Sequence, residues 1–310
     1  STPDPSALSR QAGGSGQPAR GYVRFLYSQN PFSLLSVSFV LHGTGIWYRA
    51  NATTHSPWIL FGIIASYIVM MALTGFVIVR RGQVWEDARS ILLILFVLFL
   101  ELAMTDDDVL VGDRGTGQAM LLGAWLVAAG VTELLLSGLR IRLRSLYRVP
   151  LHLLLALIVL YPLVIVRGAY PHDGERITWA VFLFSPAAAL ILLTLIPAIR
   201  RGPAYTFGNG TPWAWPYYPW SIFGCLLVVV LLRSYSLCLS FDPVLDIGWD
   251  RAQNLENRFG SIYLTPLMLA ISVLCLEWAR VSDSVAMRRA VLILPIAAVI
   301  TAIPIRGARE

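Results

Sequence analysis

Two charged side chains lie inside long apolar stretches of this sequence. Glu101 belongs to ILLILFVLFLELAM and Arg233 to CLLVVVLLRSYSLCL. A charge inside a membrane-spanning helix costs about 2.5–3.5 kcal/mol on insertion scales, so such groups usually face the protein interior or each other. Counted from the aspartates that follow each stretch, the two residues differ in depth by about three residues, or ~4.5 Å of helical rise. We expect both to face the interior, either as an ion pair joining two helices or as part of a path for a solute or proton.

Two further carboxylates, Glu133 and Glu277, lie at similar places near the ends of apolar stretches. Arg280 follows Glu277 by three residues, so a local helical ion pair is sufficient to explain that glutamate. The alternative is a symmetric pair of carboxylates in a central cavity.

The histidines and the acidic segments predict no cofactor and no metal. A bis-histidine haem needs two imidazoles at matching depth on facing helices, but His42 lies mid-stretch and His152 at the start of its stretch. We expect His42 to hydrogen-bond a neighbouring helix, where Gly43 and Gly45 allow close approach. The segments TDDDVLVGDRG and FDPVLDIGWDR match neither a calcium loop nor a zinc signature. They are interpreted as solvated loop carboxylates.

The sequence offers no pattern that predicts an enzyme or a nucleic-acid-binding protein. It contains no P-loop, zinc-protease, GxSxG or Rossmann signature. The net charge of +6 comes from arginines in short loops, with no lysine in the chain. Cys225, Cys238 and Cys275 lie in apolar stretches without a CxxC pair, so they are interpreted as small buried hydrophobes.

The apolar stretches themselves predict the fold class. The chain has 310 residues, of which 56% are hydrophobic and 14% charged, whereas soluble domains are about 25% charged. Roughly 20 helical residues cover a 30 Å hydrocarbon core. We therefore predict an all-α, polytopic membrane protein with about nine transmembrane helices, at residues 32–48, 58–79, 90–105, 118–137, 151–166, 178–199, 219–240, 261–279 and 288–303.

Arginine distribution predicts the orientation of these spans. The loops on one side carry about twice as many arginines as those on the other, and the positive-inside rule places the richer side in the cytoplasm. We expect the Ser/Gly/Pro-rich residues 1–20 to be a flexible cytosolic tail and the C-terminus to lie outside, in a bacterial inner membrane. The aromatic segment 211–220 is expected at the lipid headgroups, or alternatively as a docking surface for a partner.

Loop landmarks recur along the chain and predict two parallel four-helix repeats. The first unit covers residues 21–149, the second covers 150–286, and residues 287–310 hold a ninth helix that resembles the start of a third unit. Two units of four spans share one orientation and are related by an axis along the membrane normal. The recurring landmarks are Pro31 with Pro150, Trp58 with Trp179, Arg80-Arg81-Gly82 with Arg200-Arg201-Gly202, and Glu133 with Glu277.

These features favour a non-enzymatic module embedded in the lipid bilayer, belonging to a longer chain or to a complex that supplies further helices. The alternative is a small-solute transporter with a polar path at Glu101 and Arg233. Prolines concentrated in the second unit support that alternative, because broken helices can line binding sites. They are Pro162, Pro186, Pro197 and Pro266.

Overall fold

The computed structural model describes residues 43, 56–82, 85, 88–168, 174–241, 262–282, 289, 291–293 and 295–296. All regular elements in these ranges are helices. They are α3 (Pro57–Gly82), α4 (Ala88–Gly112), α5 (Arg114–Gly138), α6 (Ser145–Gly168), α7 (Gly174–Phe182), α8 (Phe184–Leu193), α9 (Ile196–Arg200), η2 (Pro203–Thr206), α10 (Tyr217–Ser240), η5 (Ile262–Leu264) and α12 (Thr265–Ser282).

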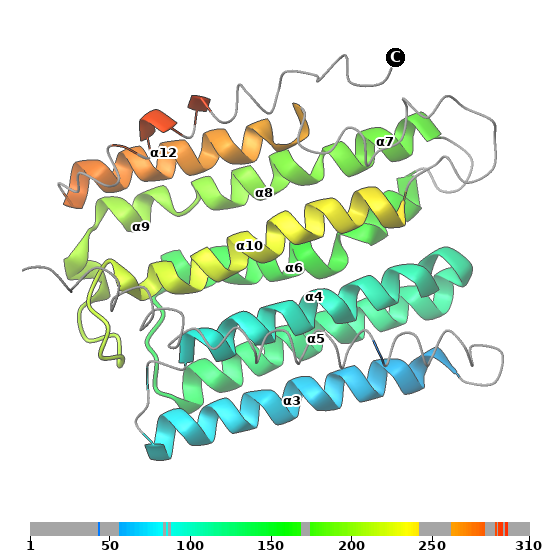
Figure 1. Ribbon diagram of the computed structural model, residues 1–310, viewed down its shortest axis with the longest axis horizontal. Helices are drawn as coiled ribbons and strands as arrows, with labels where there is room; N and C mark the ends of the chain where they lie inside the picture. Colours follow the sequence, from blue (N-terminus) through cyan, green and yellow to red (C-terminus); the bar gives the residue numbers. More distant parts are fainter. Residues whose placement is uncertain are drawn as a thin grey trace, which may run out of the picture.

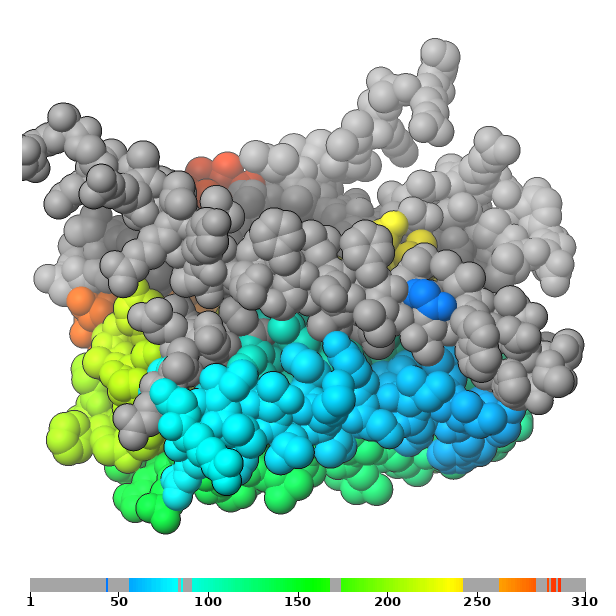
Figure 2. All heavy atoms as spheres, turned by 60° about the horizontal axis from the view of Figure 1, so that its bottom comes forward, coloured from blue at the N-terminus to red at the C-terminus, as the bar shows by residue number. Residues whose placement is uncertain are grey.

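Six helical segments of the described chain are long and apolar enough to cross a membrane. They are Pro57–Gly82, Arg114–Gly138, Ser145–Arg167, Gly174–Arg200, Tyr217–Ser240 and Ile262–Ser282. Large apolar side chains such as Val69 and Leu73 are more than half exposed on α3, which runs along one face of the molecule in Figure 2. A surface of this kind is suited to lipid rather than water. These six segments and their exposed apolar side chains support the predicted class, a multi-pass helical membrane protein. The predicted span at 32–48 lies outside the described residues apart from Gly43, as does most of 288–303.

The helices lie side by side in one bundle, as Figure 1 shows. α3 lies at one edge, next to α4 and α5; α6 and α10 follow, and α8 and α12 form the opposite edge. α4 lies inside this arrangement and contacts α3, α5, α6 and α10. It carries Glu101 and three consecutive aspartates, which separates it in composition from the six more apolar segments.

α4 and α5 form a tight hairpin with Asp113 between them. The Asp113 carboxylate accepts hydrogen bonds from the backbone of Gly115 at 3.0 Å and the hydroxyl of Thr116 at 2.6 Å, which caps the N-terminus of α5. A Cβ on Gly117 would lie 2.3 Å from the Cα of Leu110, so only glycine allows this approach of the two helices. The predicted loop over 106–117 is therefore wrong: α4 continues to Gly112 and α5 begins at Arg114, so Asp113 is the residue left between the two helices.

The sixth predicted span is divided into α7, α8 and α9 by its prolines. Proline has no N–H to donate to the carbonyl four residues earlier, which weakens the helix at that point. α7 ends at Phe182, four residues before Pro186, and α8 ends at Leu193, four residues before Pro197. The interruptions therefore follow from the sequence of this segment alone.

The packing of the helices gives no support to two equivalent units. α4 and α5, the third and fourth predicted spans, pack along each other. Their predicted counterparts behave differently: α10 packs mainly against α4 and α6, and α12 mainly against α8 and α9.

Candidate functional site

Arg233 lies at the centre of the bundle and is bound by Asp107. Both side chains have zero solvent exposure. Arg233 Nη1 donates to Asp107 Oδ2 at 2.5 Å and Nη2 donates to Oδ1 at 2.9 Å. Two parallel charge-assisted hydrogen bonds of this kind are stronger and more directional than a single contact. The pair joins α4 to α10.

A proline in α6 supplies the third attachment of Arg233. Pro162 lies inside the helix and has no N–H, so the carbonyl of Ile158, four residues earlier, loses its usual helical donor. Arg233 Nε donates to that carbonyl at 2.9 Å. The guanidinium therefore connects α4, α6 and α10, and each of its three nitrogens has an acceptor in these helices.

The end of α10 around Arg233 is held by further polar contacts. Ser236 Oγ lies 3.4 Å from Arg233 Nη1 and donates to the Arg233 carbonyl at 3.0 Å. The Tyr263 hydroxyl, from η5, donates to the carbonyl of Ser234 at 3.3 Å. Buried polar groups that are bonded in this way fix the side chain in one arrangement.

Asp106, the neighbour of Asp107, is also fully buried. Neither of its carboxylate oxygens has a hydrogen-bond partner among the described residues. It lies one helical turn before Leu110, which packs against Gly117, so Asp106 occupies the side of α4 that approaches α5. The interpretation of Asp106 and Asp107 as solvated loop carboxylates is wrong, because both belong to a helix in the middle of the bundle.

Glu101 does not provide the carboxylate that binds Arg233. It is half-buried on α4, six residues before Asp107, a separation of about 9 Å along a helix axis. The predicted depth of Glu101 is counted from Asp107 as a marker of the membrane surface, but Asp107 lies inside the bundle, so that depth is wrong. Asp242, the corresponding marker for Arg233, lies outside the described residues.

Glu133 and Glu277 take part in two separate ion-pair clusters. Glu133 on α5 binds Arg148 on α6 through both oxygens, with Arg148 Nε at 2.7 Å from Oε1. His152 Nε2 lies 2.5 Å from the same oxygen. These contacts join the two helices beside the turn that connects them. The alternative of a symmetric carboxylate pair in a central cavity is wrong for Glu133, whose partners lie on the following helix.

Glu277 on α12 binds Arg200, the last residue of α9, at 2.9 and 3.0 Å. Arg280 adds the predicted local contact, with Nη1 at 3.1 Å from Glu277 Oε1. The longer-range pairing with Arg200 does not follow from the sequence, because it depends on α9 lying beside α12.

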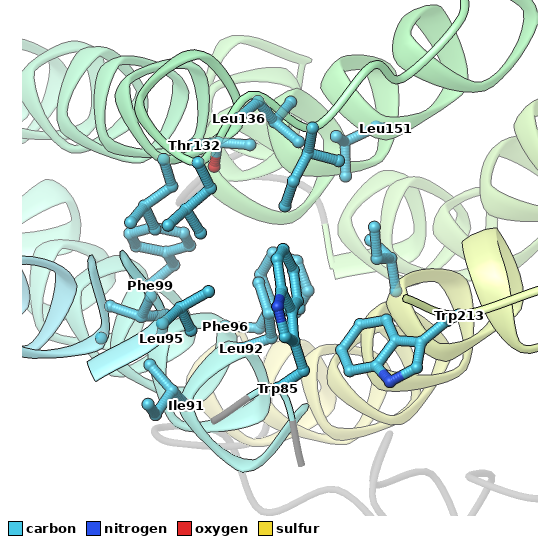
Figure 3. A pocket seen from close by; sticks show the side chains of 16 residues that line it. Trp85, Ile91, Leu92, Leu95, Phe96, Phe99, Thr132, Leu136, Leu151 and Trp213 are labelled. Carbon is cyan, nitrogen blue, oxygen red and sulfur yellow. The ribbon is translucent and has the colours of Figure 1, made fainter. Parts of the chain in front are cut away.

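An apolar pocket lies among the ends of α3, α4, α5, α6 and α10 (Figure 3). Leu92, Leu95 and Phe96 of α4 form one wall, and Trp85 and Trp213 lie together at one side. The two indole rings meet edge to face at 5.7 Å. The lining hydroxyl, that of Thr132, donates to the Ala128 carbonyl at 2.7 Å. The pocket therefore offers little to a polar solute.

The aromatic segment after η2 folds back onto the turn between α5 and α6. The backbone N–H of Arg142 donates to the Asn209 carbonyl at 2.8 Å. Gly210 has φ +81°, and a Cβ there would lie 2.2 Å from the Arg140 carbonyl oxygen. Further along, the ring of Trp220 stacks on Trp278 of α12 at 4.7 Å. The placement of the aromatic segment 211–220 at the lipid headgroups stays a prediction.

The remaining sequence candidates concern the first predicted span and metal binding. His42 lies outside the described residues, so its proposed contact stays a prediction. No group of three or more His, Cys, Asp or Glu side chains in the described ranges is arranged to hold a metal ion.

Comparisons with protein-family models, with curated proteins and with solved structures find no match to this chain.

Proposed function

We propose that this chain is a membrane-embedded module without catalytic activity, belonging to a longer chain or to a complex. The observation that carries the proposal is the Asp107–Arg233 pair. It is fully buried, and through the Ile158 carbonyl it joins α4, α6 and α10. A buried ion pair is tolerated when its geometry is good and its remaining donors are satisfied. Arg233 meets that condition, as expected of a group that holds helices together.

The character of the pocket also supports a structural role over transport. A path for a polar solute needs polar groups that line a cavity at membrane depth. The pocket in Figure 3 is lined almost wholly by apolar side chains, and Arg233 is enclosed by Asp107, Ser236 and the Ile158 carbonyl.

Assembly in the native membrane tests the proposal. The chain should be extracted from its own cells into lipid nanodiscs and its mass measured by native mass spectrometry. We expect a defined assembly heavier than the 34.3 kDa of this chain, with a fixed ratio to another polypeptide or as part of a longer one. A chain of this mass alone, with no other polypeptide, contradicts the proposal.

A small-solute transporter is the second candidate. Asp106 favours it, because a buried carboxyl without a hydrogen-bond partner is costly and such groups often mark ion pathways. In this candidate the predicted polar path at Glu101 and Arg233 would also include Asp106, which lies beside the Asp107–Arg233 pair. Purified protein in liposomes with an internal pH dye should then carry protons under an imposed potential. Asp106→Asn should abolish the flux, whereas a wild type without flux contradicts proton-coupled transport.

The finer architecture is also proposed: nine spans with a cytosolic N-terminus, an external C-terminus and a bacterial inner-membrane location. Gly112, the last residue of α4 at the α4–α5 turn, and Ser137, near the far end of α5, test the orientation. A Cβ on Gly112 meets no atom within 4 Å, and Ser137 is exposed, so cysteine is acceptable at both positions. Gly112→Cys should react with an impermeant thiol reagent in intact cells and Ser137→Cys only after permeabilisation. The reverse pattern contradicts the orientation.

The two four-helix units stay a sequence-based proposal that rests on the loop landmarks. Superposition of α3–α5 on the corresponding helices of the second half would support it. The different neighbours of α5 and α12 speak against close equivalence.

A further inference from the structure

Three charged side chains share a fully buried region of the bundle, and their charges do not balance. Asp106, Asp107 and Arg233 each have zero solvent exposure. Arg233 contributes one positive charge, whereas two ionised aspartates would contribute two negative charges. Among the described residues, the charged groups that act on Asp106 are Asp107 on its own helix and Arg233 on α10.

Arg233 is not arranged to bind Asp106. Its Nη1 and Nη2 donate to Asp107, and its Nε donates to the carbonyl of Ile158. Both oxygens of Asp106 are without a hydrogen-bond partner in the described ranges. Asp107 thus takes the available cation, and Asp106 lies on the adjacent side of the helix, toward α5.

An ionised carboxylate without a partner in an apolar interior is so costly that the group normally takes up a proton instead. We propose that Asp106 is a proton-binding site inside this membrane protein, occupied by a proton while Asp107 holds Arg233. With the proton in place, the cluster of three side chains is neutral. This inference rests on the second candidate function and deepens it by assigning a resident proton to Asp106, whether or not protons cross the membrane.

Release of the proton would couple to helix packing. The O–H bond of Asp106 breaks, the proton passes to water, and a second carboxylate is left beside the one guanidinium. Asp106 and Asp107 then compete for Arg233, which is attached to α10 and to the Ile158 carbonyl of α6. Proton binding and the α4–α10 contact therefore influence each other, as linkage requires.

Infrared spectroscopy tests the protonation state directly. Wild-type protein in lipid at neutral pH should show the carbonyl band of a protonated carboxylic acid, shifted by ¹³C-aspartate labelling and by deuterium. Asp106→Asn should remove this band. Asp108→Asn is the matched control, because Asp108 is the exposed neighbour on the same helix, and that variant should retain the band.

Thermal unfolding gives a second, independent readout. Asparagine resembles a neutral aspartic acid, so Asp106→Asn should unfold close to the wild-type temperature at neutral pH. Asp107→Asn leaves Arg233 without its counter-ion and should unfold at a clearly lower temperature. A wild type without the acid band overturns the inference, whether or not Asp106→Asn folds. So does stabilisation by sodium at fixed pH in place of that band, since a metal cation would then occupy the site. Neither measurement depends on the native assembly, so the two proposals fail separately.

Discussion

Replacing Arg233 by leucine removes the side chain on which α4, α6 and α10 converge. The change leaves Asp107 buried without its cation, a loss that typically costs about 3–5 kcal/mol. It also leaves the Ile158 carbonyl without a donor, because Pro162 cannot supply one, which adds about 1–3 kcal/mol. Since folded domains are stable by about 5–15 kcal/mol, Arg233→Leu should remove a large part of the total.

The double variant Asp107→Leu/Arg233→Leu distinguishes the cost of leaving one charge unpaired from the contribution of the ion pair as a whole. Apolar replacement of a whole buried pair is often neutral or stabilising, so the double variant should be more stable than Arg233→Leu alone. The difference between the double variant and the sum of the singles measures their coupling. Reversible unfolding in lipid or detergent, followed by circular dichroism, gives the four free energies.

Arg148→Leu is the matched control for the same chemistry at the surface. Arg148 also binds a carboxylate, that of Glu133, through two nitrogens, but its side chain is 52% exposed, whereas that of Arg233 is fully buried. Exposed ion pairs contribute little, so Arg148→Leu should have a much smaller effect than Arg233→Leu. Equal effects of the two variants, or a double variant no more stable than Arg233→Leu, refute the reasoning.

Pro162→Ala restores an N–H opposite the Ile158 carbonyl, so it should stabilise the Arg233→Leu variant more than it stabilises the wild type; equal effects in unfolding experiments argue against the shared carbonyl. Glu277→Gln should lower the unfolding temperature more than Glu133→Gln, because the Glu277 side chain is 9% exposed and that of Glu133 32%; the opposite order contradicts the ranking by burial. Hydrogen bonds from the Thr116 hydroxyl and backbone lower the pKa of Asp113, so its stabilising effect is present above the ordinary aspartate pKa and is lost as pH falls through the lowered value. Thermal unfolding of Asp113→Ala and wild type should therefore differ at neutral pH and converge in acid, and a constant difference rules out the carboxylate as the cause.

Local features of the structure follow from the sequence alone. Long apolar stretches predict membrane helices, because the bilayer core holds no water to bond the backbone. The N–H and C=O groups of each stretch must therefore bond one another within a helix. The contact of Glu277 with Arg280 depends only on helical spacing, and it is present. The breaks before Pro186 and Pro197 likewise depend on a missing N–H four residues along the same chain.

The candidate site depended on lateral packing, which the sequence does not contain. The run of aspartates at 106–108 resembles a loop by composition, yet α4 continues through it, with Asp106 and Asp107 buried between helices and Asp108 exposed. Leu102, Asp106 and Leu110 recur at four-residue intervals on one buried face, which is a signal of that continuation, but the polarity of the run obscures it.

What the sequence by itself determined was the helical membrane class, the local ion pair of Glu277 and the positions at which prolines leave a helical carbonyl without its N–H donor. Only the tertiary structure decided that Arg233 meets Asp107 rather than Glu101, and that the carbonyl released by Pro162 becomes an acceptor for Arg233. The physical reason is that hydrophobicity and backbone hydrogen bonding act along one helix. The partner of a buried charge is set instead by which helices lie side by side and by how each is rotated about its axis.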